Sequence, residues 1–303
     1  MTTLLRSLAL SAVAIASLSA APLTPDYLGV PRYITVTSFS QNLANGGEFN
    51  GRVLNTGTSL PANSAGFTNS NSIATKFWCV DSQLYFSFND FGYANIVGIN
   101  QLPGLANAVR YGNISANAPA DPGWTNHSFA IAGGGTVALP TAAKDRYLMA
   151  AYLVSRYSFV GSGNAGNNNT NIQKAIWSIM HNNTATADDG GTAGNDGPFG
   201  AGVIDKGVTS NTLAGTVNTQ SIAWWVNKAN TEYATKVDPT KWAIVSWLVT
   251  SQGSLLGTNG NERPSVDRQT FLVQVVPEPG FYGVLAGGLG ILLWGVRRRK
   301  TEV

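Results

Sequence analysis

The most restrictive feature of this 303-residue chain is an apolar segment near its C-terminus that ends in four adjacent cations. The segment from Gly280 to Val296 is uncharged, and Arg297, Arg298, Arg299 and Lys300 follow it directly. Its 17 residues are at the short end of what spans a bilayer. A basic cluster beside such a span stays on the cytoplasmic side. The sequence therefore predicts a transmembrane helix at 280–296 with a basic membrane stop, outside the globular fold.

The first 21 residues have the order of segments found in secretory signal peptides. Arg6 precedes an apolar run from Leu8 to Ala16, and small residues continue to Ala21. The run is too short to cross a bilayer as an anchor. We therefore expect a signal peptide at 1–21, an extracellular domain at 22–275 and a separate C-terminal tail at 276–303. We expect the chain to be exported through the inner membrane, with its C-terminus cytoplasmic before processing.

The basic excess of the chain belongs to these two ends. Five of the 19 Lys and Arg residues and two of the 16 Asp and Glu residues lie there, which leaves 14 of each sign in the body. A body with no net charge and no basic run lacks the clustered cations that nucleic-acid binding requires. We therefore expect no nucleic-acid partner.

The four residues just before the apolar segment indicate what the C-terminal tail does. Val276, Pro277, Glu278 and Pro279 form a stiff, extended stretch because proline fixes the backbone. This stretch, the apolar segment and the basic end together resemble the PEP-CTERM sorting signal of Gram-negative bacteria. The resemblance implies recognition by an exosortase, cleavage near Pro277 to Pro279, and only a transient stay in the inner membrane. The final location is then the cell surface or the extracellular space.

The body is predicted to be α+β and mainly β, with a helical insert. Runs of β-branched and aromatic residues predict strands at 32–38, 83–88, 241–250 and 269–276. Apolar residues at helical spacing predict helices at 141–157, at 170–182 with Asn169 or Thr170 as cap, and at 221–230. Two stretches rich in glycine, asparagine and aspartate predict loops at 161–169 and 188–197.

Cys79 is the only cysteine of the chain, so it has no partner for an intramolecular disulfide. It follows Phe77 and Trp78, and Gln173 lies 94 residues further along, in the sequence Ile172-Gln173-Lys174-Ala175-Ile176-Trp177. The two segments resemble the thioester domains of bacterial surface adhesins, although Ile172 stands where that family has threonine. The helix at 147–157 also resembles the family pattern.

The resemblance implies that the Cys79 sulfur and the Gln173 carbonyl join with loss of ammonia. The thioester carbonyl is then open to a nucleophile such as a lysine amine on a partner. Gln173 is expected in the first turn of its helix, where it shares a side with Trp177. Trp78 and Trp177 are expected to shield the bond. The expected partner is a surface amine, or an extracellular polysaccharide or protein.

A simpler interpretation remains open for the same residues. Cys79 is then a small buried hydrophobic residue, and Gln173 is an ordinary residue on a helix surface. The corresponding function is that of a non-reactive structural or matrix protein of the envelope or biofilm.

Other motifs are weaker. Gly161 to Gly166 fits a dinucleotide glycine pattern, but the segment before it is predicted as helix rather than strand, so we expect no cofactor. Asp188 to Gly197 lacks the ligand order of an EF-hand, and a solvated turn is favoured over calcium. His127 and His181 are the only histidines, and no zinc or hydrolase motif includes them. We expect neither a metal site nor an enzyme.

Overall fold

The computed structural model describes residues 22–43, 46–59, 61–80, 88–105, 108–109, 128–131, 134–157, 163–181, 212–213, 220–246, 255–256, 262–263 and 270–275. The predicted signal peptide and the tail at 276–303, with its sorting motif, membrane helix and basic stop, lie outside these residues. Among the described helices, none combines the length and apolar character that crossing a membrane requires.

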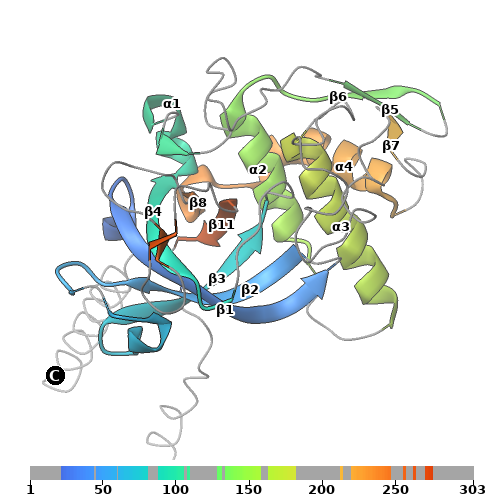
Figure 1. The fold of residues 1–303 in the computed structure, drawn as a ribbon. Coiled ribbons are helices and arrows are strands. Elements are labelled where there is room, and N and C mark those ends of the chain that lie inside the picture. Colours follow the sequence, from blue (N-terminus) through green and yellow to red (C-terminus); the bar gives the residue numbers. More distant parts are fainter. Residues whose placement is uncertain are drawn as a thin grey trace, which may run out of the picture.

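The main sheet of the described chain is antiparallel and closes on itself (Figure 1). Its strands are β1 (Pro31–Leu43), β2 (Gly46–Leu54), β3 (Ser72–Cys79), β4 (Phe91–Gly98), β8 (Trp242–Ser246), β9 (Leu255–Leu256), β10 (Glu262–Arg263) and β11 (Thr270–Gln274). Six of them form a barrel in the order β1-β2-β3-β11-β8-β4, because β4 also pairs with β1. β9 and β10 extend the sheet beyond β4.

The barrel can close because β1 pairs with two strands, β2 and β4. Its first residues, 31–35, pair with β4, whereas residues 34–43 pair with β2. The pairing with β2 shifts register between Val36 and Ser38 and again between Phe39 and Gln41. Such irregularities bend a strand and increase its twist. The bent β1 can therefore leave one neighbour and join the other.

One face of the barrel strands forms a buried, apolar interior. Phe49 of β2 and Phe271 of β11 meet edge to face at 5.7 Å between ring centroids, although β3 lies between their strands in the sheet. We call the interior the barrel cluster: Leu23, Tyr27, Ile34, Val36, Phe49, Val53, Phe77, Cys79, Ala94, Ile96, Trp177, Ala243, Val245, Phe271, Val273 and Val275. Because side chains alternate along a strand, the neighbours of these residues face outward.

The helices cover one side of the barrel (Figure 1). They are α1 (Leu102–Leu105), α2 (Ala143–Val154), α3 (Gly163–His181) and α4 (Ile222–Lys236). All four come between β4 and β8 in the chain, together with a small sheet of β5 (Ser128–Ile131), β6 (Thr136–Ala138) and β7 (Thr212–Leu213). Their apolar residues pack on outward residues of the barrel such as Trp78, Ile244 and Leu272, and we call this second core the helix-facing cluster. The expected β-rich fold with a helical insert is confirmed at this level.

α2 is the central helix of the insert. Every residue from Arg146 to Val154 is buried, and the helix contacts both α3 and α4. Arg146 is itself fully buried, and it donates to the carbonyls of Pro140 at 2.8 Å and Ile179 at 2.9 Å. Burial lowers the pKa of Arg146 to about 9. Since Ile179 lies in the last turn of α3, where carbonyls lack helical partners, Arg146 fixes that end of α3 against α2.

The structure corrects two details of the predicted helices. α3 begins at Gly163 rather than near Thr170, so most of the predicted loop at 161–169 is helical. Asn169 is already 2% exposed there, because packing outweighs the low helix propensity of asparagine and glycine. Neither Asn169 nor Thr170 is therefore the cap. α4 begins at Ile222, one residue after the predicted start, with Ser221 as its cap, and it continues past the predicted end at residue 230 to Lys236.

Three of the four predicted strands correspond to strands of the structure. Those at 32–38 and 269–276 correspond to β1 and β11, and the first half of 241–250 corresponds to β8. Most of the strand predicted at 83–88 lies outside the described residues, and Phe88 is in a turn. β2, β3 and β4 were not predicted. The predicted loop at 188–197 also lies outside the described residues.

The barrel is tightly packed around Gly51. A Cβ atom there would lie 2.4 Å from the Thr35 carbonyl oxygen and 2.6 Å from the Phe77 ring. We predict that Gly51→Ala lowers the free energy of unfolding by about 1–3 kcal/mol, as overpacking usually does. Urea denaturation followed by tryptophan fluorescence measures this. Gly104→Ala is the control, because a Cβ atom at Gly104 meets nothing within 4 Å. Equal losses in both variants would contradict the packing of Phe77 on Gly51.

Candidate functional site

Cys79 is the last residue of β3 and pairs with Phe271 of β11. Its side chain is fully buried in the barrel cluster. The next residue, Val80, still donates its backbone N–H to the Thr270 carbonyl at 3.1 Å, so the strand end is fixed on both sides of the cysteine. The sulfur therefore has a defined position inside the barrel, out of contact with solvent.

Two residues of α3, Gln173 and Trp177, contact Cys79. The Gln173 side-chain Nε2 donates to the Cys79 carbonyl at 3.0 Å, and the Trp177 Nε1 donates to the Cys79 Sγ at 3.5 Å. The two residues are four apart, so they share one face of the helix, as predicted. Gln173 is fully buried and Trp177 is 5% exposed. The predicted pair, Cys79 and Gln173, is therefore joined by a hydrogen bond from the Gln173 side chain to the Cys79 main-chain carbonyl.

The site lies where the two cores meet. Trp177 is a member of the barrel cluster, whereas its helix neighbours Ile176 and Met180 belong to the helix-facing cluster. α3 thus inserts one aromatic side chain beside the cysteine while it packs its remaining apolar residues on α2 and α4. Ile172, the departure from the resembled motif, is fully buried in the helix-facing cluster. An apolar side chain suits that position.

Tyr157 is a site residue that the sequence did not reveal. It follows the end of α2, and its hydroxyl donates to the Gln173 Oε1 at 2.6 Å. The pKa of Tyr157 is raised well above its usual value of 10.0, chiefly because burial penalises the phenolate and also because Cys79 and Glu48 lie nearby. Tyr157 therefore stays protonated and donates at neutral pH. Both ends of the Gln173 amide are occupied, one by Tyr157 and one by Cys79.

Trp78 lies on the other face of β3 from Cys79, in the helix-facing cluster. Its Nε1 donates to the Glu48 carboxylate at 3.2 Å, and its ring meets Trp242 edge to face at 5.6 Å. Trp177 contacts the sulfur directly, so it is the nearer of the two predicted shields. The shielding role of Trp78 stays a prediction.

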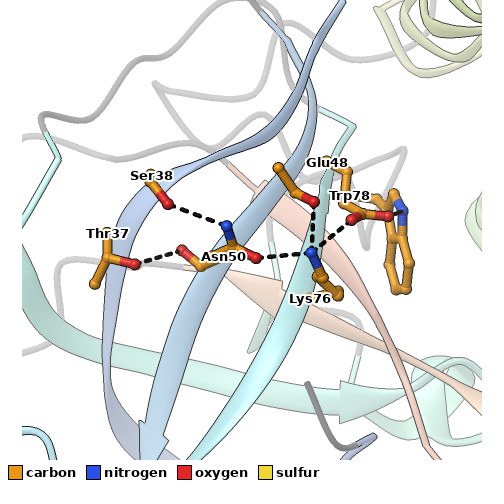
Figure 2. Close-up of polar contacts among 7 residues, drawn as sticks. Thr37, Ser38, Glu48, Asn50, Lys76 and Trp78 are labelled. Atoms are coloured by element: carbon orange, nitrogen blue, oxygen red, sulfur yellow. Dashed lines mark hydrogen bonds and ion pairs between the residues drawn. The ribbon is translucent and has the colours of Figure 1, made fainter. Parts of the chain in front are cut away.

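A polar cluster on β1, β2 and β3 holds this end of the sheet (Figure 2). Lys76 contacts the Glu48 carboxylate at 2.8 Å and the Asn50 Oδ1 at 2.7 Å, and it also donates to Ser40. The Asn50 side-chain amide in turn donates to the Ser38 hydroxyl at 3.0 Å. The Asn50 main-chain carbonyl accepts from the Thr37 hydroxyl at 3.1 Å. Because Glu48 pairs directly with Trp78, this cluster fixes the strand residue that precedes Cys79.

The interpretation of Gln173 as an ordinary residue on a helix surface is wrong, because the side chain is fully buried. The placement of Gln173 in the first turn is also wrong, since α3 begins ten residues earlier, at Gly163. Gln173 therefore lies in the middle of α3, not in a terminal turn. Cys79 is buried, which both interpretations of that residue require.

No group of three or more His, Cys, Asp and Glu side chains that could hold a metal ion occurs among the described residues. The glycine pattern at 161–166 is helical from Gly163 onward rather than a phosphate-binding turn between a strand and a helix. His127 and the Asp188 to Gly197 segment lie outside the described residues. Val276, Pro277, Glu278 and Pro279 lie outside them too.

Comparison of the chain with protein-family models, curated proteins and solved structures finds no match. The interpretation of the site therefore depends on its own residues and geometry.

The hydrogen bonds of Gln173 can be tested as stabilising contacts in a Cys79→Ala background, where no covalent bond to residue 79 can form. We predict that adding Gln173→Leu lowers the free energy of unfolding by roughly 2–4 kcal/mol, because it leaves the Tyr157 hydroxyl and the residue 79 carbonyl without their partner. Urea denaturation measures the difference. Lys174→Ala, at the half-buried neighbouring position, should change stability by less than about 0.5 kcal/mol. Equal effects at both positions would contradict the buried bridge.

Proposed function

We propose that this chain is an exported surface protein whose body forms an internal thioester between Cys79 and Gln173, which it uses to attach covalently to a partner. The observation that carries the proposal is the contact between the two residues. The Gln173 amide donates to the Cys79 carbonyl at 3.0 Å, although the residues are separated by 94 positions in the chain. The only cysteine and the fully buried glutamine thus lie together.

The surroundings suit a thioester for two reasons. The site is dry, since Cys79 and Gln173 are fully buried, and a thioester is long-lived only where water is excluded. The chain also holds no second thiol that could exchange with the bond. A carbonyl bonded to sulfur is a stronger electrophile than an amide because thiolate is the better leaving group. A lysine amine on an extracellular protein can therefore displace the sulfur and form a stable amide.

The mass of the purified body tests this proposal. We predict that it is lower than the sequence mass by one ammonia, about 17 Da, because the amide nitrogen is lost when the acyl–sulfur bond forms. Methylamine should add about 31 Da to that species and release one alkylatable thiol. Cys79→Ala and Gln173→Ala, treated identically, should show the full sequence mass and no methylamine adduct.

An unmodified mass with a freely alkylatable Cys79 would exclude the thioester. It would favour the second candidate, a non-reactive structural or matrix protein of the envelope or biofilm. The full burial of Cys79 in the barrel cluster is the observation on which that alternative depends, because a cysteine in such a place is often a small hydrophobic residue.

We also propose that the tail directs the chain to the outer surface. The order of Pro277-Glu278-Pro279, an apolar segment and four cations supports transient insertion in the inner membrane followed by exosortase cleavage. We predict that deletion of 277–279 leaves uncleaved protein in the inner membrane of an exosortase-containing host, whereas the intact chain is recovered outside it without its tail. Immunoblots of the fractions with an antibody against the body measure this. Identical processing of both forms would contradict the sorting role.

A further inference from the structure

We infer that Tyr157 is a catalytic residue of this site: its hydroxyl stabilises the negative charge that develops on the Gln173 Oε1 when the thioester forms and again when a nucleophile opens it. The inference rests on the proposed thioester between Cys79 and Gln173. It adds a reason why an ordinarily inert amide reacts at this place in the chain.

Formation of the bond has a defined balance of atoms and charge. The Cys79 sulfur attacks the Gln173 Cδ, the S–C bond forms, and the carbonyl electron pair moves onto Oε1. The thiol proton passes to Nε2, the carbonyl re-forms, and the Cδ–Nε2 bond breaks to release ammonia. No oxidant or reductant is needed. Ammonia leaves to water, where it is diluted and protonated, and this draws the reaction forward.

During these reaction steps the largest negative charge develops on the Gln173 Oε1. The Tyr157 hydroxyl already donates to that atom at 2.6 Å. Both side chains are buried, Tyr157 at 4% exposure and Gln173 at 0%. A preorganised donor in a water-excluded site stabilises a developing oxyanion more than water does, because it needs no reorganisation and the surrounding dielectric is low. The raised pKa of Tyr157 keeps the proton on its oxygen, so it acts as a donor rather than a base.

Two other contacts prepare the same centre. The Cys79 carbonyl accepts from the Gln173 Nε2 at 3.0 Å, which fixes the rotation of the amide and directs its oxygen to Tyr157. The Trp177 Nε1 donates to the Cys79 Sγ at 3.5 Å, which holds the sulfur against the same face of α3 that carries Gln173. The position of Tyr157 is itself fixed, because its backbone N–H donates to the Val154 carbonyl at the end of α2. The hydroxyl is therefore placed by a buried helix.

Tyr157→Phe tests the inference, with Tyr152→Phe as the matched control. Tyr152 is also buried, lies in α2 five residues before Tyr157, and donates to Glu232 instead of Gln173. We expect Tyr157→Phe to slow two reactions by about 10²-fold, as loss of an oxyanion donor does. One is the appearance, after cell-free synthesis, of the species that is lighter by one ammonia, and the other is the second-order opening of the thioester by methylamine. Tyr152→Phe should leave both rates near those of the unaltered chain.

The outcomes separate the two claims. If the unaltered chain shows the mass loss and Tyr157→Phe reacts as fast, Tyr157 is not catalytic and the thioester stands. If the unaltered chain shows no mass loss, the proposed function fails and this inference fails with it. Should Tyr157→Phe not fold, fluorotyrosines of graded acidity placed at position 157 keep the ring and the hydroxyl. Opening rates that follow the acidity of the hydroxyl would support the inference, and constant rates would overturn it.

Discussion

The side-chain amide of Gln173 is the contact on which the site depends, because it joins the two cores of the molecule. Its nitrogen donates to Cys79, at the rim of the barrel interior, and its oxygen accepts from Tyr157, which packs among the helices. A fully buried amide needs partners for both ends, since an unpaired buried polar group is costly. The helices and the barrel must therefore keep one relative position for both bonds to persist.

The rest of the fold supports this position. The bent β1 closes the barrel, so that β3 is held between β2 and β11 and ends at Cys79. Arg146 ties the last turn of α3 to α2, which carries Tyr157 just beyond its end. Such rigidity suits the proposed thioester chemistry, because reacting atoms held in one geometry need little reorganisation.

The sequence predicted part of this arrangement and missed part of it for identifiable reasons. Apolar spacing located α2, and β-branched runs located β1, β8 and β11, because these signals are local. Closure of the barrel depends on the pairing of β4 with β1, which no local pattern contains. The early start of α3 was hidden by glycines and asparagines that packing overrides. Cys79 and Gln173 were proposed from motif resemblance alone. Tyr157 was missed, because its hydrogen bond exists only after α2 and α3 dock.

The most direct test of the thioester is an experimental crystal structure of the body at a resolution that separates bonded from non-bonded atoms. The proposed chemistry predicts continuous electron density at covalent distance between the Cys79 Sγ and the Gln173 Cδ. No density should remain for the Gln173 Nε2, and the Tyr157 hydroxyl should stay on the carbonyl oxygen. A separated sulfur, with an intact Gln173 amide still donating to the Cys79 carbonyl, would contradict it.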